Sequence, residues 1–101
     1  MLMLVISRPV PTKPSLVKEH RQAYWEWIAR QVNQGFVKDM YGIVGRGMVV
    51  VFNVDSNQTL NHLLNEWMEI VPAEFDIIPI IDPKGMRAFL SDGDSTSVSS
   101  D

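Results

Sequence analysis

The stretch Met48-Val49-Val50-Val51-Phe52 decides the fold, because five successive apolar residues predict a strand that is buried on both faces. The run from Leu2 to Ile6 has the same character and is followed by Arg8 and Pro9, which end it. The chain has 101 residues, which corresponds to about one domain. We therefore expect both runs to lie in the centre of a single sheet.

A second strand is predicted just before the valine-rich stretch. Residues 36–43 mix polar and apolar side chains, and the charged pair Lys38 and Asp39 lies among them. Mixed polarity is typical of a strand at the edge of a sheet. The glycines of Gly45-Arg46-Gly47 favour a turn, so the two strands should form a hairpin.

Two amphipathic helices are predicted between the strands. The first has Ser15 as its N-cap and Gly35 as its C-cap. Its apolar stripe follows helical spacing: Leu16, Ala23, Tyr24, Trp27 and Ile28. The second begins at Asp55-Ser56-Asn57-Gln58, which is similar to a capping box, and Pro72 ends it. Its stripe consists of Leu60, Leu63, Leu64, Trp67, Met68 and Val71.

The element order β-α-β-β-α-β predicts an α+β domain of the ferredoxin-like kind. Its antiparallel sheet has four strands in the order 4-1-3-2, and both helices lie on one face. The last strand is predicted at residues 75–81, where Pro79 restricts it to an edge because proline lacks a backbone N–H. We expect this domain to span residues 1–90 and the Ser/Asp-rich residues 91–101 to form a disordered tail.

The second face of the sheet requires a cover. Two helices can cover only one face, whereas both central strands carry apolar residues on both faces. The simplest cover is the sheet of another copy, which gives a homodimer or a larger homo-oligomer with a barrel-like interior, a dimeric α+β barrel. Trp25 points away from the core stripe and is either a subunit contact or a partly buried edge residue.

The composition argues against several classes of function. The net charge is -3 and the basic residues are scattered, so nucleic acid is not an expected partner. There is no cysteine, and the two histidines lie far apart, so neither a disulfide nor a metal site is expected. No apolar run approaches the ~20 residues of a membrane helix, and the start lacks a basic signal region. We expect a cytoplasmic protein with no membrane partner.

Four stretches carry a resemblance to a known family. They are Met1-Leu2-Met3-Leu4-Val5, Tyr41-Gly42-Ile43-Val44-Gly45 with the strand after it, Val54-Asp55-Ser56, and Ile70-Val71-Pro72-Ala73-Glu74-Phe75-Asp76-Ile77. In these stretches, and over residues 1–82, the chain resembles the muconolactone isomerase family of dimeric α+β barrels. The resemblance implies a homo-oligomer that shifts a proton within an unsaturated lactone and needs no cofactor. The first helix departs from the family, which has a Lys- and Glu-rich start there.

Three residues are candidates for catalysis. His20 lies in the stripe of the first helix, and its ordinary pKa of ~6.5 suits proton transfer. Tyr24 is one helical turn later, so the two side chains could form a relay. Tyr41 precedes Gly42, and a glycine in a strand often marks a close approach of the backbone. Packing in the core is the alternative interpretation of all three.

Three further residues are candidates for substrate binding. Arg46 lies between two glycines and could bind a carboxylate at the mouth of the barrel. Trp27 could line an aromatic cavity, and Asp76 matches the resembling family's last strand. A solvated turn arginine, a core tryptophan and a loop cap are the corresponding structural interpretations.

Three functions follow from these observations. The first is a cofactor-free isomerase that acts on a lactone or a related organic acid. The second is a cofactor-independent monooxygenase on the same scaffold, which would favour a cavity with aromatic walls. The third is a non-catalytic binding or assembly module. A cavity of a few hundred Å³ between helices and sheet would favour the enzymes. The sequence does not specify the substrate, the role of the tail or an oligomer beyond a dimer.

Overall fold

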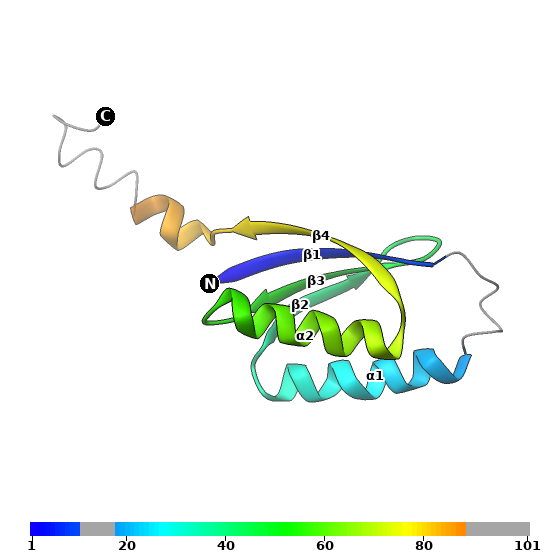
Figure 1. The fold of residues 1–101 in the computed structure, drawn as a ribbon. Coiled ribbons are helices and arrows are strands. Elements are labelled where there is room, and N and C mark those ends of the chain that lie inside the picture. Colours follow the sequence, from blue (N-terminus) through cyan, green and yellow to red (C-terminus); the bar gives the residue numbers. More distant parts are fainter. Residues whose placement is uncertain (11–17, 89–101) are drawn as a thin grey trace, which may run out of the picture.

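The computed structural model describes residues 1–10 and 18–88. Its elements follow the predicted order: β1 (Leu2–Pro9), α1 (Lys18–Asn33), β2 (Val37–Gly42), β3 (Met48–Asn53), α2 (Asn57–Ile70) and β4 (Ala73–Ile80). The four strands form one sheet in the order β2-β3-β1-β4, which is the predicted order. Both helices pack on the same side of this sheet (Figure 1). The ferredoxin-like α+β fold is therefore confirmed.

The two apolar runs are the central strands, as the sequence predicts. β1 pairs antiparallel with β3, and Val5 lies opposite Val50 in this register. Both side chains are fully buried, as is that of Phe52 on the same face of β3. Neighbouring residues point to the opposite face of a strand, so each central strand presents apolar side chains to both sides.

β1 is longer than predicted, because it continues to Pro9 rather than ending near Ile6. Arg8 and Pro9 pair only with the start of β4, because β3 begins at Met48, opposite Ser7. With one strand beside it instead of two, this part of β1 tolerates a proline. β4 itself is an edge strand that contains Pro79, as predicted.

The caps of the helices explain where they start and stop. Ser56 is the N-cap of α2, and its side chain accepts a hydrogen bond from the backbone N–H of Thr59. Gly35 follows α1 with a φ of +87°, the left-handed conformation that a glycine C-cap supplies. The predicted N-cap of α1, Ser15, lies outside the described residues, as does the predicted tail at 91–101.

An aromatic cluster fills the space between helices and sheet. Trp67 of α2 is its centre, with ring centroids 4.8 Å from Tyr24, 5.9 Å from Trp27 and 5.1 Å from Phe75. The exposed fraction of Trp67 is only 2%. Such ring pairs add to the stabilisation from burial alone. The cluster therefore joins both helices to β4.

The other face of the sheet has no cover among the described residues. The register places seven apolar side chains on this face, because residues opposite each other in a ladder share a face. We call them the open face: Leu2, Leu4 and Ile6 of β1, Val49 and Val51 of β3, and Ile78 and Ile80 of β4. All seven are partly or largely exposed. An ion pair between Arg8 and Asp76 lies at one end of this face.

The β2–β3 turn contains a close approach that only glycine permits. Gly47 has a φ of +121°, and a Cβ at this position would lie 2.6 Å from the carbonyl oxygen of Ser7. Gly45 has a φ of +98° but no atom within 4 Å of such a Cβ. The turn is therefore held against β1 at Gly47 and lies free of it at Gly45.

This difference predicts unequal effects of alanine at the two glycines. We expect Gly45→Ala to lower the free energy of unfolding by about 1–2 kcal/mol, the usual cost of left-handed backbone for L-residues. Gly47→Ala should cost more, because the hairpin must also move away from β1. Urea unfolding of the two variants measures the difference. Equal losses would contradict the close approach at Gly47.

Candidate functional site

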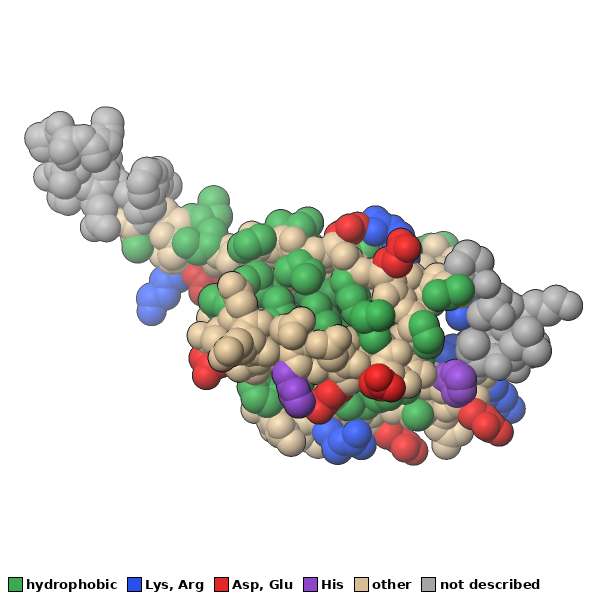
Figure 2. All heavy atoms as spheres, in the orientation of Figure 1, with side chains coloured by type: hydrophobic (Ala, Val, Ile, Leu, Met, Phe, Trp, Pro, Cys, Tyr) green, Lys and Arg blue, Asp and Glu red, His purple; other side chains and the backbone are tan. Residues whose placement is uncertain are grey.

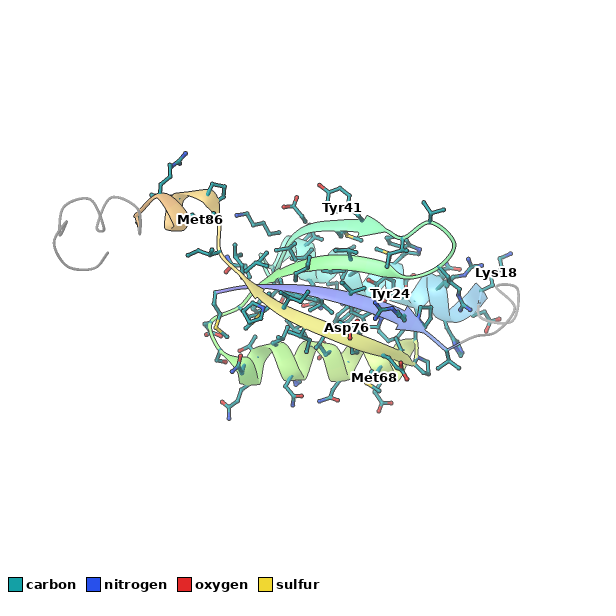
Figure 3. The ribbon with its side chains drawn as sticks, turned by 90° about the horizontal axis from the view of Figure 1, so that it is seen from above. Lys18, Tyr24, Tyr41, Met68, Asp76 and Met86 are labelled. Carbon is teal, nitrogen blue, oxygen red and sulfur yellow. The ribbon has the colours of Figure 1, made fainter. Side chains whose placement is uncertain are left out.

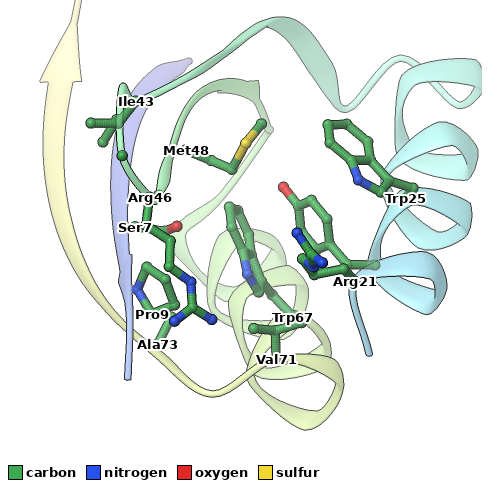
Figure 4. A pocket seen from close by; sticks show the side chains of 13 residues that line it. Ser7, Pro9, Arg21, Trp25, Ile43, Arg46, Met48, Trp67, Val71 and Ala73 are labelled. Atoms are coloured by element: carbon green, nitrogen blue, oxygen red, sulfur yellow. The ribbon is translucent and has the colours of Figure 1, made fainter. Parts of the chain in front are cut away.

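A cavity of about 240 Å³ lies between the helices and the sheet, beside the β2–β3 turn. We call it the Tyr24 pocket (Figure 4). Its walls come from four parts of the chain: Ser7 and Pro9 of β1, Arg21, Tyr24 and Trp25 of α1, Ile43, Gly45, Arg46, Gly47 and Met48 around the turn, and Trp67, Val71 and Ala73 at the junction of α2 and β4. The close approach of Gly47 to Ser7 fixes one of these walls.

Tyr24 supplies a buried polar group to the pocket. Its exposed fraction is 5%, and its hydroxyl group has no hydrogen-bond partner among the described residues. Burial raises the pKa of Tyr24 well above its ordinary value of about 10, so the phenol keeps its proton at neutral pH. A buried polar atom without a partner is uncommon in proteins and calls for an explanation. Here it is a buried hydrogen-bond donor of a residue that lines the pocket.

Two arginines lie at the pocket. Arg21 comes from α1 and Arg46 from the β2–β3 turn, so their side chains reach the pocket from different elements (Figure 4). A guanidinium nitrogen of Arg46 donates a hydrogen bond to the carbonyl oxygen of Val10 at 3.4 Å. None of the described residues that line the pocket is acidic or a histidine. The lining thus contains two guanidinium groups, a kind of group that can bind an anion.

Aromatic rings form much of the remaining wall. The ring of Tyr24 lies 5.7 Å from that of Trp25 and 4.8 Å from that of Trp67. Trp67 is buried, whereas Trp25 is 52% exposed and lies at the mouth. A flat ligand with delocalised electrons can pack against such walls. The pocket thus combines aromatic surface, a phenol donor and two guanidinium groups.

The structure brings together two of the predicted site residues, Tyr24 and Arg46. His20 lies on α1 one turn before Tyr24, but it is exposed and outside the pocket lining. Tyr41 is 66% exposed on β2, on the same side of the sheet as the open face. Figure 3 shows Tyr24 beneath the sheet and Tyr41 at its far edge. A relay that includes Tyr41 is not formed within one chain.

The other two predicted residues lie elsewhere. Asp76 pairs with Arg8 at the end of the open face. Trp27 is buried, and its indole N–H donates to a carboxylate oxygen of Glu66 at 2.8 Å. The other oxygen of Glu66 lies 2.9 Å from Nε2 of His62. This chain of contacts links α1 to α2 beside a second pocket, which Trp27, His62 and Glu66 help to line.

Arg21 belongs to the site but was not predicted there. Its spacing of three from Tyr24 and four from Trp25 places the three side chains on neighbouring parts of one helix. That spacing was visible in the sequence. What the sequence did not show is that the β2–β3 turn closes over this part of α1.

Within residues 1–10 and 18–88, no group of three or more His, Asp or Glu side chains is arranged to hold a metal ion. None of the described helices is long and apolar enough to cross a membrane.

Comparison with known proteins identifies a family for the chain. A family profile described as "Domain of unknown function (DUF3303)" matches residues 1–94. No curated protein matches the chain.

The unpartnered hydroxyl of Tyr24 leads to a prediction about stability. We expect Tyr24→Phe to leave the unfolding free energy of the ligand-free protein unchanged or to raise it, because the substitution removes a buried polar atom without breaking a hydrogen bond. Trp27→Phe is the matched control, because it removes an N–H that does have a partner, and it should destabilise the protein. Thermal and urea unfolding measure both variants.

The raised pKa of Tyr24 gives this experiment a second measurement. Above pH ~10 the phenol ionises in the unfolded chain but not in the folded one, so stability should fall as the pH rises past this value. Tyr24→Phe should remove the part of this loss of stability that comes from the ionisation of Tyr24. A variant that loses stability at neutral pH would show that the hydroxyl has a structural partner.

Proposed function

Because the chain belongs to the DUF3303 family, whose description names no activity, we propose its function from the pocket itself: it binds a small cyclic or aromatic organic acid in the Tyr24 pocket. One observation carries this proposal. The hydroxyl of Tyr24 is buried at the pocket wall and lacks a partner among the described residues. A ligand oxygen would complete its hydrogen bond.

The other groups of the pocket define the ligand. Arg21 and Arg46 favour a carboxylate, and the aromatic rings of the lining favour a flat ligand that packs against them. The Tyr24 hydroxyl donates to a carbonyl or lactone oxygen of that ligand. The volume of about 240 Å³ is below the ~300–1,000 Å³ of typical ligand pockets, so the ligand is compact.

The resemblance to the muconolactone isomerases supports a proton shift as the reaction of this site. In that reaction, the phenol of Tyr24 would stabilise negative charge that develops on a carbonyl oxygen. A proton shift also needs a base, and the described lining contains neither a carboxylate nor an imidazole. His20, the predicted base, is one helical turn from Tyr24 and would have to turn toward the pocket. Binding of the acid is therefore better supported than its isomerisation.

A monooxygenase on the same scaffold is the second candidate, and the aromatic walls of the pocket favour it. Its substrate would be an electron-rich phenol rather than a lactone. Oxygen consumption with a phenolic acid separates this candidate from the first.

The ligand proposal predicts a specific effect of Tyr24. We expect muconolactone or benzoate to quench the fluorescence of the tryptophans at the pocket, and Tyr24→Phe to weaken this binding about tenfold, the equivalent of one hydrogen bond. Arg46→Gln should weaken binding of the acids but not of an uncharged analogue. Tyr41→Phe, which alters a tyrosine outside the pocket, should bind like the parent protein.

The same variants test the reaction. In a spectrophotometric isomerisation assay on muconolactone, turnover that depends on both Tyr24 and His20 would support the isomerase. Binding without turnover would leave an organic-acid-binding protein. If no cyclic acid binds, or if Tyr24→Phe binds as tightly as the parent, the proposal is wrong.

We further propose that two copies pair through the open face. Its centre is apolar and its polar groups lie at the rim, where Arg8 pairs with Asp76 and Tyr41 marks the outer strand. This is the usual anatomy of a protein interface. Two copies of one flat face can cover each other about a two-fold axis, as sheets do in sandwiches. A cytoplasmic homodimer is the form that this proposal and the composition support.

The pairing proposal predicts that a charge on the open face separates the copies. Leu4→Glu places a carboxylate at the centre of that face, opposite Val51 and Ile78, and should give a folded monomer. Val44→Glu is the matched control, because Val44 is fully exposed beside the turn and should leave the dimer intact. Sedimentation velocity of the parent and both variants measures this. A parent protein that is monomeric at micromolar concentration would refute the pairing.

A further inference from the structure

One polar side chain interrupts the apolar layer that the two central strands turn toward the helices. Residues opposite each other in a ladder share a face, and every second residue of a strand lies on that face. The helix-facing layer therefore consists of Met3, Val5 and Ser7 of β1 with Met48, Val50 and Phe52 of β3. Ser7 is the polar member of this layer, so its hydroxyl group lies on the side of the sheet that the helices cover.

Ser7 has almost no contact with bulk water. Its exposed fraction is 3%, and apart from aromatic residues only Ser7 and Gln31 are buried polar residues within 1–10 and 18–88. By contrast, Figure 2 shows charged side chains at the molecular surface, where water completes their hydrogen bonds. Burial of a hydroxyl group is unfavourable unless it forms a hydrogen bond within the protein or with a bound molecule.

Ser7 belongs to the wall of the Tyr24 pocket on the sheet side. Figure 4 shows it at β1, across the pocket from Arg21 and Trp25 of α1. Tyr24 is also a residue of α1, so the two hydroxyl-bearing residues of the lining come from opposite layers of the fold. A ligand that lies between the sheet and the helices therefore has one of them on each side.

The packing of the β2–β3 turn explains why residue 7 is small but not why it is polar. A Cβ at Gly47 would lie 2.6 Å from the carbonyl oxygen of Ser7, so the turn lies close against the backbone of β1 there. An alanine at position 7 would be at least as small, and it would bury no polar atom. The hydroxyl group of Ser7 therefore needs a separate explanation.

The side chains of the pocket offer many hydrogen-bond donors and few acceptors. The two arginines and the two tryptophans of the lining only donate, and the sulfur of Met48 is a weak acceptor. Hydroxyl oxygens accept as well as donate, and among the lining residues only Ser7 and Tyr24 carry them. The oxygen of an aliphatic alcohol accepts more strongly than that of a phenol, whose lone pair is delocalised into the ring. Ser7 is thus the best side-chain acceptor in the pocket.

We infer that the ligand of the Tyr24 pocket carries a hydroxyl or enol group that donates a hydrogen bond to the hydroxyl oxygen of Ser7, an inference that rests on the proposed function. In this arrangement Tyr24 donates to a different oxygen of the ligand, and the arginines bind its carboxylate. The class of ligand narrows from cyclic acids in general to hydroxylated cyclic acids. Ser7 is then the residue that determines this specificity.

Pairs of ligands that differ in one donor test the inference. Isothermal titration calorimetry compares 3- and 4-hydroxybenzoate with 3- and 4-fluorobenzoate, because fluorine is small and cannot donate a hydrogen bond. We expect at least one hydroxybenzoate to bind the parent protein about tenfold more tightly than the fluorobenzoate with the same substitution position, the equivalent of one hydrogen bond. Equal dissociation constants within both pairs would overturn the inference.

Ser7→Ala removes the acceptor and keeps the residue small. We expect this variant to lose the preference for the hydroxylated ligand, and to bind benzoate and the fluorobenzoates within about twofold of the parent protein. Tyr41→Phe is the matched control, because it removes a hydroxyl group outside the pocket and should keep the preference. A preference that survives Ser7→Ala would overturn the inference, because another group would then recognise the hydroxyl of the ligand.

Failure of this inference and failure of the proposed function give different results. If benzoate binds and Tyr24→Phe weakens its binding, but the hydroxyl and fluorine ligands bind the parent protein equally, the inference is wrong and the proposed function stands. If none of these acids binds, both are wrong. The comparison of the two ligands in the parent protein needs no variant, so this part of the test does not depend on the folding of Ser7→Ala.

Discussion

One constraint governs this structure: two helices cannot cover both faces of a four-stranded sheet. The central strands bury Val5, Val50 and Phe52 beneath the helices. The side chains that alternate with them emerge on the other face, where they are apolar as well. Even β4 lies partly beyond the helical layer, so its Ile77 stays exposed. The open face, through which we propose that copies pair, is thus the direct result of covering a sheet from one side.

The same two-layer arrangement creates the pocket. A layer of two helices meets the sheet closely at the Trp67 cluster but leaves a gap beneath the β2–β3 turn. Gly47 brings this turn against β1, and the side chain of Arg46 comes with it. Tyr24 lines the gap from the helical side, and its buried hydroxyl group has no hydrogen-bond partner among the described residues. The core and the pocket therefore share residues. Packing in the core positions the Tyr24 hydroxyl group, which we propose binds the ligand.

Most of the fold could be predicted from the sequence, because the signals were local. Strand order followed from which runs were apolar throughout, and the start of α2 followed from a serine cap. The site was predicted only in part, since a pocket depends on which distant segments meet. Tyr24 and Arg46 meet because the turn closes over α1, but Asp76 is directed to the open face by the strand register. The spacing of residues along the chain predicts neither the position of the β2–β3 turn over α1 nor the register of β4 against β1.

The buried hydroxyl of Tyr24, which lacks a partner within residues 1–10 and 18–88, has a consequence for the protein in the cell. When the pocket is empty, the buried hydroxyl group lacks a hydrogen-bond partner among the described residues. The folded protein is then less stable than it would be with a ligand bound to this group. A ligand that binds only the folded state then stabilises it by an amount that grows with the concentration of free ligand. Because small changes in stability alter how much protein survives degradation, the level of this chain would follow the supply of its own small molecule. Binding of the ligand in the pocket would then determine how long the protein survives in the cell.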